Sequence, residues 1–93
     1  MNDAYVYEWI RLDTNEPFYV GKGRGFRAYD IKKDRNRYFK NIIKKLGIEN
    51  VAVSILHDGL DDQTALEYEV YYIDLYKNQF GFNLTNLTDG EKK

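Results

Sequence analysis

The sequence predicts an α+β domain in which helices flank a three-stranded antiparallel sheet. Two aromatic-rich runs with strand propensity, residues 4–11 and 17–21, border a turn-like segment and indicate a β-hairpin. A third run, 51–56, places Val and Ile at alternate positions, and helical spacing of apolar residues appears on both sides of it. A chain of 93 residues has room for a single domain, residues 1–93, with one modest core.

The hairpin determines how two tyrosines are expected to lie. Successive residues of a strand point to opposite faces, and directly opposed residues of an antiparallel pair share a face. With an odd-length loop, such as the five residues 12–16, Tyr7 is expected opposite Tyr19 on one face of the sheet. Phe18 and Val20 are then expected on the other face.

A glycine-punctuated cationic turn follows the second strand. Its glycines stand at alternate positions between basic residues: Gly21, Lys22, Gly23, Arg24, Gly25 and then Arg27. Glycine permits positive φ and lets a polyanion approach the backbone closely. The spacing matches neither the P-loop nor the dinucleotide-binding pattern, and no βαβ context surrounds it. The turn is therefore a candidate phosphate-binding element of another kind.

Two helical segments are predicted between this turn and the third strand. A short helix within 26–31 would aim Arg27 back at the hairpin. A longer helix, 35–46, has Asp34 as its expected N-cap and ends at Gly47. Its apolar residues form a stripe at three- and four-residue spacing, with basic residues outside the stripe.

A helix predicted over 62–77 carries one carboxylate on its apolar side. At about 100° per residue, Glu69 falls in the same arc as Leu66, Val70 and Ile73. A carboxylate in that position is costly unless something pairs with it. A salt bridge to Arg27 or to a lysine would meet that need, and so would a bound metal ion. The residues alone leave these two interpretations equal.

Composition excludes several kinds of site and of location. The chain has no cysteine and one histidine, which argues against disulfides and the usual zinc sites. His57 precedes Asp58 and Gly59 and is expected to be a turn or surface residue, not a base. No apolar run approaches the roughly 20 residues of a membrane helix, and the N-terminus does not resemble a secretory leader. The protein is expected to be intracellular, in the cytoplasm of a bacterium or of a phage-infected host, with no membrane partner.

Charge is strongly segregated although the net charge is only −1. Residues 22–45 contain ten Lys or Arg and two Asp, whereas residues 49–74 contain seven acids and no Lys or Arg. Segregation of this kind gives one face a phosphate-attracting surface that the overall isoelectric point hides. A solvated helix face is the plainer explanation, but the basic run begins at the aromatic hairpin, which favours nucleic acid.

Several separated stretches of the chain carry a family resemblance when they are taken in order. They are Tyr5-Val6-Tyr7, Tyr19-Val20-Gly21, Arg27, the segment 65–73 around Glu69, and the segment 83–90. Together they resemble the GIY-YIG nuclease superfamily. Tyr5 stands where the family's name has its first glycine, and Val6 and Val20 stand where it has isoleucine. Valine keeps strand propensity, so the resemblance is little weakened.

The resemblance implies an active site for phosphodiester hydrolysis. Tyr7 would be the general base or would orient the water, with Tyr19 as its hydrogen-bonded partner. A phenol with a pKa near 10 is a poor base at pH 7, and Lys22, at the hairpin end, is the cation expected to lower it. Arg27 would clamp two phosphate oxygens. Glu69 would hold one Mg²⁺ or Mn²⁺ ion, completed by water and substrate phosphate.

Further residues are expected to contact the nucleic acid. The family places an asparagine near the end of the module; Asn86 fits that context better than Asn83. The full set of expected DNA contacts is Lys22, Arg24, Arg27, Lys33, Arg35, Arg37, Lys40, Lys44 and Asn86.

The expected function is that of a metal-dependent DNA endonuclease leaving 5′-phosphate and 3′-hydroxyl ends. Double-strand cleavage would need a homodimer or two sequential nicks. The enzyme's targets would be set by DNA shape, by a partner or by a further domain. Two other functions stay open. One is a nucleic-acid-binding module without turnover. The other is a protein-interaction domain whose acidic part, 49–74, meets a basic partner.

Overall fold

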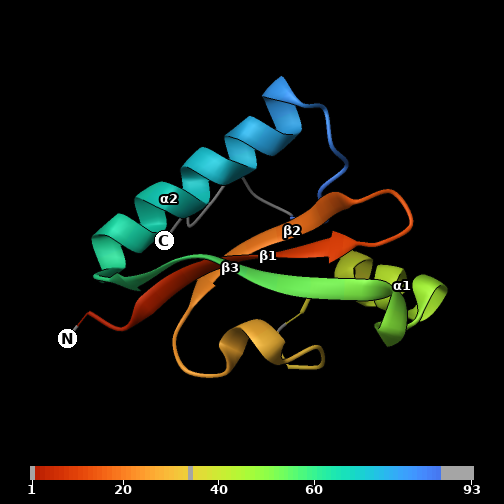
Figure 1. Cartoon of the computed structure of the whole chain (residues 1–93), viewed down its shortest axis with the longest axis horizontal. Coiled ribbons are helices and arrows are strands. Elements are labelled where there is room, and N and C mark those ends of the chain that lie inside the picture. The colour runs from red at the N-terminus through yellow and green to blue at the C-terminus, as the bar shows by residue number, and fades with distance from the viewer. Residues whose placement is uncertain (1, 34, 87–93) are drawn as a thin grey trace.

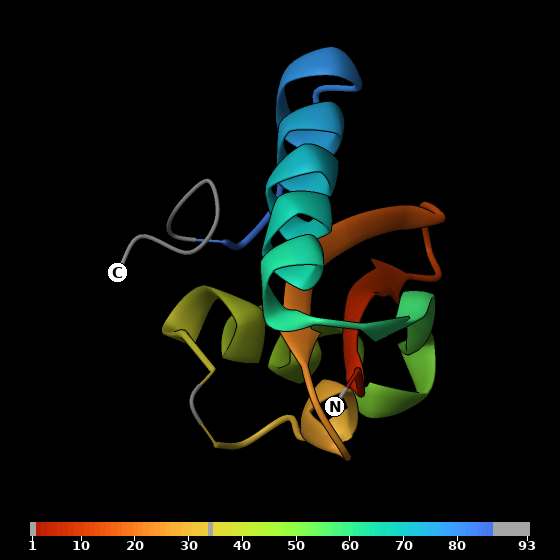
Figure 2. The same cartoon turned by 90° about the vertical axis from the view of Figure 1, so that its left-hand side faces the viewer.

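A computed structural model describes residues 2–33 and 35–86 of the chain. They form one antiparallel sheet in the order β2-β1-β3, built from β1 (Ala4–Arg11), β2 (Glu16–Gly23) and β3 (Val51–Leu60). Helix α2 (Asp62–Asp74) covers one face, while α1 (Arg37–Leu46) and the short 3₁₀ helix η1 (Arg27–Tyr29) lie on the other (Figure 1; Figure 2). The predicted α+β class with a three-stranded antiparallel sheet is confirmed.

A β-bulge changes the register of the hairpin. The register shifts beside Trp9, where Phe18 is the extra residue of β2. Trp9 therefore pairs with Tyr19, and Tyr7 pairs with Gly21. The predicted direct opposition of Tyr7 and Tyr19 is wrong, because a five-residue loop that pairs Arg11 with Pro17 would pair Tyr7 with Gly21. Both tyrosines nevertheless pack into the same core, on the α1 face. The bulge also turns Phe18 to the face opposite the predicted one.

The sheet separates two apolar cores. The core on the α1 side is rich in aromatic residues and consists of Tyr5, Tyr7, Trp9, Phe18, Ala28, Phe39 and Val51. The core on the α2 side contains the smaller residues Ala4, Val6, Val20, Ala65 and Ile73. Alternation along β1 thus sends Tyr7 toward α1 and Val6 toward α2.

The helices follow the sequence pattern with small changes at their ends. The N-cap of α1 is Asn36, whose side-chain oxygen accepts a 2.9 Å hydrogen bond from the Phe39 amide. The expected cap, residue 34, lies outside the described residues. Gly47 ends α1 as predicted, with φ of 90°. Helix α2 continues into a π-helical turn, Leu75–Gln79, close to the predicted end.

Strand β3 extends beyond the predicted 51–56 and carries His57, so this residue is not in a turn. The His57 ring stacks on Tyr68 at 4.1 Å between centroids, and Nε2 lies 2.9 Å from the Tyr72 hydroxyl. These contacts make His57 part of the packing between β3 and α2. In the described part of the chain, no helix has the length and apolar character needed to cross a membrane.

Candidate functional site

Two tyrosines and one arginine form a cluster on the α1 face of the sheet. The rings of Tyr7 and Tyr19 lie diagonally across β1 and β2, with 6.2 Å between their centroids. The guanidinium carbon of Arg35 lies 5.4 Å from the Tyr7 centroid and 5.3 Å from the Tyr19 centroid. Arg35 Nη1 donates a 2.7 Å hydrogen bond to the Tyr7 hydroxyl. The two phenols are therefore held in contact by a shared cation.

Arg35 itself is buried, with 6% of its surface exposed. Its Nε and Nη2 donate to the carbonyl oxygens of Asp30 at 2.7 Å, Arg27 at 2.8 Å and Ala28 at 3.4 Å. The predicted contact between Arg35 and DNA is wrong, because its donors are used inside the protein. Arg35 instead holds the segment 27–30 against the sheet.

Tyr7 and Tyr19 differ in how far they are buried, and this difference affects their chemistry. Tyr7 is 1% exposed, and burial raises its pKa to about 12, with a further rise from Tyr19 and a partial offset from the Arg35 hydrogen bond. At neutral pH in this conformation, Tyr7 keeps its proton and has almost no contact with solvent. Tyr19 is partly exposed. Of the pair, Tyr19 is therefore the residue with substantial contact with solvent.

Two glycines of the cationic turn leave room for site side chains. A Cβ on Gly21 would lie 2.6 Å from the Tyr7 hydroxyl and 2.9 Å from Cε2 of Tyr19. A Cβ on Gly23 would lie 2.7 Å from Cγ of Arg27. Positive φ is found in this turn only at Gly25, at 57°. Glycine is required at positions 21 and 23 because a Cβ there would collide with neighbouring side chains, and not because the backbone adopts a positive φ.

A cationic cleft of about 330 Å³ lies at the end of β2. Its lining residues are Ala4, Lys22, Gly23, Arg24, Arg27 and Asp62. They come from both sides of the sheet: Lys22 pairs with Val6, whose side chain faces α2, whereas Arg27 begins η1 on the α1 side. Three cations and one carboxylate give this cleft a net positive charge, as a phosphate site requires.

Hydrogen bonds and ion pairs fix two of the three cations of this cleft, Arg27 and Arg24. Arg27 Nη1 donates to the Lys33 carbonyl oxygen at 2.7 Å. Arg24 pairs with Asp62 at 2.5 Å and with Asp3. Asp62 was not predicted as a site residue, because an acid in the first turn of a helix is ordinary and gave no separate signal.

Glu69 lies on the other side of the sheet from the tyrosine pair. It stands one helical turn from both Ala65 and Ile73, which pack with Val6 and Val20 beneath α2. The expectation that Tyr7 and Glu69 open into a single pocket is therefore wrong. Helical periodicity shows which side of α2 is apolar, but not which face of the sheet that side covers.

The donor set near Glu69 limits the metal that it could hold. Among the described residues, no three His, Cys, Asp or Glu side chains gather into a metal site. One carboxylate oxygen of Glu69, Oε1, is buried. A site with a single protein carboxylate fits Mg²⁺ or Mn²⁺, which keep several water ligands and also bind substrate phosphate.

The remaining predicted DNA contacts divide into two groups. Lys33, Arg37, Lys40 and Lys44 are exposed, the last three on the outer surface of α1. The Asn86 side chain instead bonds to both backbone groups of Val20, accepting from N at 3.1 Å and donating to O at 2.7 Å. Asn86 thus attaches the chain segment after α2 to β2.

Fold and site together define an α+β protein with a cationic cleft at the end of an edge strand, beside a buried tyrosine–arginine cluster. No protein-family model matches the chain, and neither a curated protein nor a solved structure does.

Proposed function

We propose that the chain is a metal-dependent DNA endonuclease of the GIY-YIG type, which hydrolyses phosphodiester bonds to 5′-phosphate and 3′-hydroxyl ends. The observation that carries the proposal is the convergence of Lys22, Arg24 and Arg27 in one cleft at the end of β2. Tyr19, on the same strand, is partly exposed to solvent. A phosphodiester in this cleft would meet three cations of the glycine-punctuated turn, one of which, Arg27, also belongs to the family resemblance.

Each residue has a role that follows from its surroundings. Arg27 binds two non-bridging phosphate oxygens, because a planar guanidinium offers paired donors. Lys22 adds a positive charge beside them. Tyr19 orients the attacking water by hydrogen bonding. Tyr7 and Arg35 position Tyr19 and do not touch the substrate, since both are buried.

Glu69 is the proposed ligand of one Mg²⁺ or Mn²⁺ ion. A divalent ion supplies charge stabilisation to the phosphoryl oxygens and lowers the pKa of bound water. Since Glu69 and Tyr7 lie on opposite faces, we assign the reaction to the cleft at the end of β2, whose lining comes from both sides of the sheet; Glu69 itself does not line this cleft. DNA as substrate also favours an intracellular site of action.

Supercoiled plasmid incubated with the protein tests this proposal. The protein should convert the plasmid to the nicked form with Mg²⁺ or Mn²⁺ and should leave it intact in EDTA. DNA ligase should reseal the nicks, because sealing requires adjoining 5′-phosphate and 3′-hydroxyl ends. Plasmid that stays supercoiled under all metal conditions would argue against the endonuclease.

The second candidate is a nucleic-acid-binding module without turnover. It is favoured by the burial of Tyr7, whose raised pKa makes it a poor base. It predicts salt-sensitive DNA binding through the basic residues of 22–45, with no metal requirement and no nicking. Binding titrations at several salt concentrations, alongside the plasmid assay, separate the two functions.

A further inference from the structure

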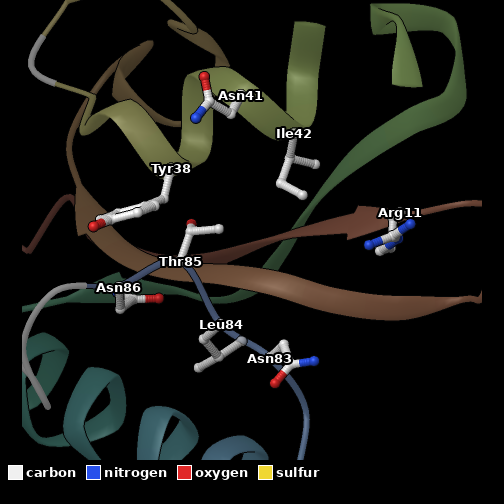
Figure 3. A pocket seen from close by; sticks show the side chains of 8 residues that line it. All are labelled: Arg11, Tyr38, Asn41, Ile42, Asn83, Leu84, Thr85 and Asn86. Atoms are coloured by element: carbon white, nitrogen blue, oxygen red, sulfur yellow. The ribbon is translucent and has the colours of Figure 1, made fainter. Parts of the chain in front are cut away.

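A second cleft, of about 520 Å³, lies between α1 and the segment 83–86, which we term the β2 strap (Figure 3). Helix α1 contributes Tyr38, Asn41 and Ile42, and Arg11 lies at one end of the cleft. All of the β2 strap lines the other side: Asn83, Leu84, Thr85 and Asn86. None of the functions proposed above uses this cleft.

Hydrogen bonds fix both walls of the cleft. The Thr85 amide donates to the Phe18 carbonyl oxygen at 2.7 Å, so the β2 strap runs beside the outer edge of β2. Asn36, the N-cap of α1, donates from Nδ2 to the Thr85 carbonyl oxygen at 2.9 Å. The strap is thereby tied to the sheet and to the helix, and the space between them is preformed.

The lining combines an aromatic ring, apolar side chains and amides. Tyr38 is 45% exposed, and the Arg37 guanidinium carbon lies 5.1 Å from its ring centroid. Ile42 and Leu84 provide aliphatic surface, while Asn41 and Asn83 provide amide donors and acceptors. Aromatic rings stack on nucleobases, and asparagine amides pair with base edges. The chemistry of this lining suits a flat heterocycle with a polar edge.

The cleft lies beside β2 and is bordered by exposed cations, so a bound DNA strand could extend into it. Asn86 lines the cleft and also bonds to Val20, the residue that follows Tyr19 on β2. Exposed cations border the α1 side, with Arg37 next to Tyr38 and Lys45 two turns further along. A strand whose phosphate occupies the cleft at the end of β2 and that follows this edge strand toward its start would pass Asn86 and approach Tyr38.

We propose that the cleft between α1 and the β2 strap binds one unstacked base of the substrate strand, near the phosphate to be cut. The inference rests on the proposed function for the identity of the polymer. It narrows the substrate class to DNA with an unpaired or displaced base, such as a single strand, a loop or a junction. Intact duplex would bind less tightly, because its bases are not free to enter the cleft.

Binding in EDTA to two fluorescent single strands of equal length and charge tests the inference. One strand carries bases and the other carries abasic sites throughout. Wild-type protein should bind the base-bearing strand about tenfold more tightly, as expected for stacking on one aromatic ring. Tyr38→Ala should lose most of this preference, and Tyr38→Phe should keep it. Tyr71→Ala, which removes an exposed tyrosine on α2, is the matched control and should also keep it.

Equal binding of both strands by wild-type protein would overturn the inference, as would an unchanged preference in Tyr38→Ala. The experiment needs neither metal nor turnover. A protein that nicks plasmid but shows no base preference would refute the base cleft alone. A protein that shows the preference but never nicks would refute the endonuclease alone.

Discussion

Arg35 Nη1 donates a 2.7 Å hydrogen bond to the Tyr7 hydroxyl in the interior of the protein. The same guanidinium bonds to carbonyl oxygens of the segment 27–30, which carries Arg27 to the cationic cleft. A buried charge is costly unless its donors are satisfied, and here they are shared between a strand and a loop. Arg35 therefore couples the stability of the fold to the geometry of the proposed site.

Arg35→Met is expected to lower the free energy of unfolding by about 3 kcal/mol, because buried carbonyl oxygens and a phenol lose their donor. Urea denaturation monitored by circular dichroism measures this change. Arg37→Met is the matched control: Arg37 is exposed, and its loss should cost less than about 0.5 kcal/mol. Equal stability of the two variants would contradict the structural role given to Arg35.

Tyr7 makes stability depend on pH in the alkaline range. Burial raises its pKa to about 12 in the folded protein, against about 10 in the unfolded chain. Both states keep the proton below about pH 10, so the contribution of Tyr7 is fully present there. Above that pH the unfolded state binds fewer protons, and the free energy of unfolding falls by up to about 3 kcal/mol as pH approaches 12.

Urea titrations from about pH 9 to about 12 measure this decline. Tyr7→Phe should remove part of it, while Tyr76→Phe should remove another part, since burial and Glu8 also raise the pKa of Tyr76. Tyr29→Phe, at an exposed position, should leave the decline unchanged. A decline that survives Tyr7→Phe in full would show that Tyr7 is not buried as described.

Gly21→Ala should disturb the tyrosine pair, because the new Cβ would lie 2.6 Å from the Tyr7 hydroxyl and 2.9 Å from a Tyr19 ring carbon. The expected loss of stability is about 1–3 kcal/mol, as for other overpacked sites.

Gly23→Ala should instead displace Arg27, whose Cγ would lie 2.7 Å from the new Cβ, and weaken DNA binding. Near-ultraviolet circular dichroism and DNA titration measure the two effects, and interchanged results would refute these assignments.

The two tyrosines should differ in catalysis. Tyr19→Phe removes the hydroxyl of the partly exposed tyrosine and should slow plasmid nicking by about 100-fold, as for loss of a catalytic hydrogen-bonding group. Tyr7→Phe should slow it by less than about tenfold, because Tyr7 acts only through its neighbours. Initial rates at saturating plasmid, with unfolding checked separately, measure the difference. A larger loss in Tyr7→Phe would restore Tyr7 as the group that acts on water.

The element order and the sheet class could be predicted because periodicity and turn residues mark them locally. The end of α1 at Gly47 and the start of α2 at Asp62 are examples. The bulge at Phe18 could not be predicted, since it depends on how β2 packs against Phe39 and Trp9. Without the bulge, the register of Arg11 with Glu16 would pair Tyr7 with Val20; the shift pairs Tyr7 with Gly21 and so brings Tyr7 and Tyr19 onto one face.

The glycine spacing of the turn predicted that Lys22, Arg24 and Arg27 lie close together. The burial of Arg35 was not predicted. An arginine in a basic run is typical of a surface, and its interior partners are carbonyl oxygens and a phenol that no sequence pattern links to it. The side of the sheet occupied by Glu69 was equally hidden. An apolar stripe shows that α2 packs on the sheet, whereas the crossing from β3 decides which face it covers.

The proposed endonuclease activity is tested most directly by comparing Glu69→Gln with Glu67→Gln in the plasmid assay with Mg²⁺. Both substitutions remove one carboxylate from α2, but Glu67 is exposed and its side chain accepts a hydrogen bond from Gln63. The account predicts that Glu69→Gln abolishes nicking and that Glu67→Gln nicks at the wild-type rate. Nicking by Glu69→Gln at the wild-type rate, with the fold intact, would contradict it.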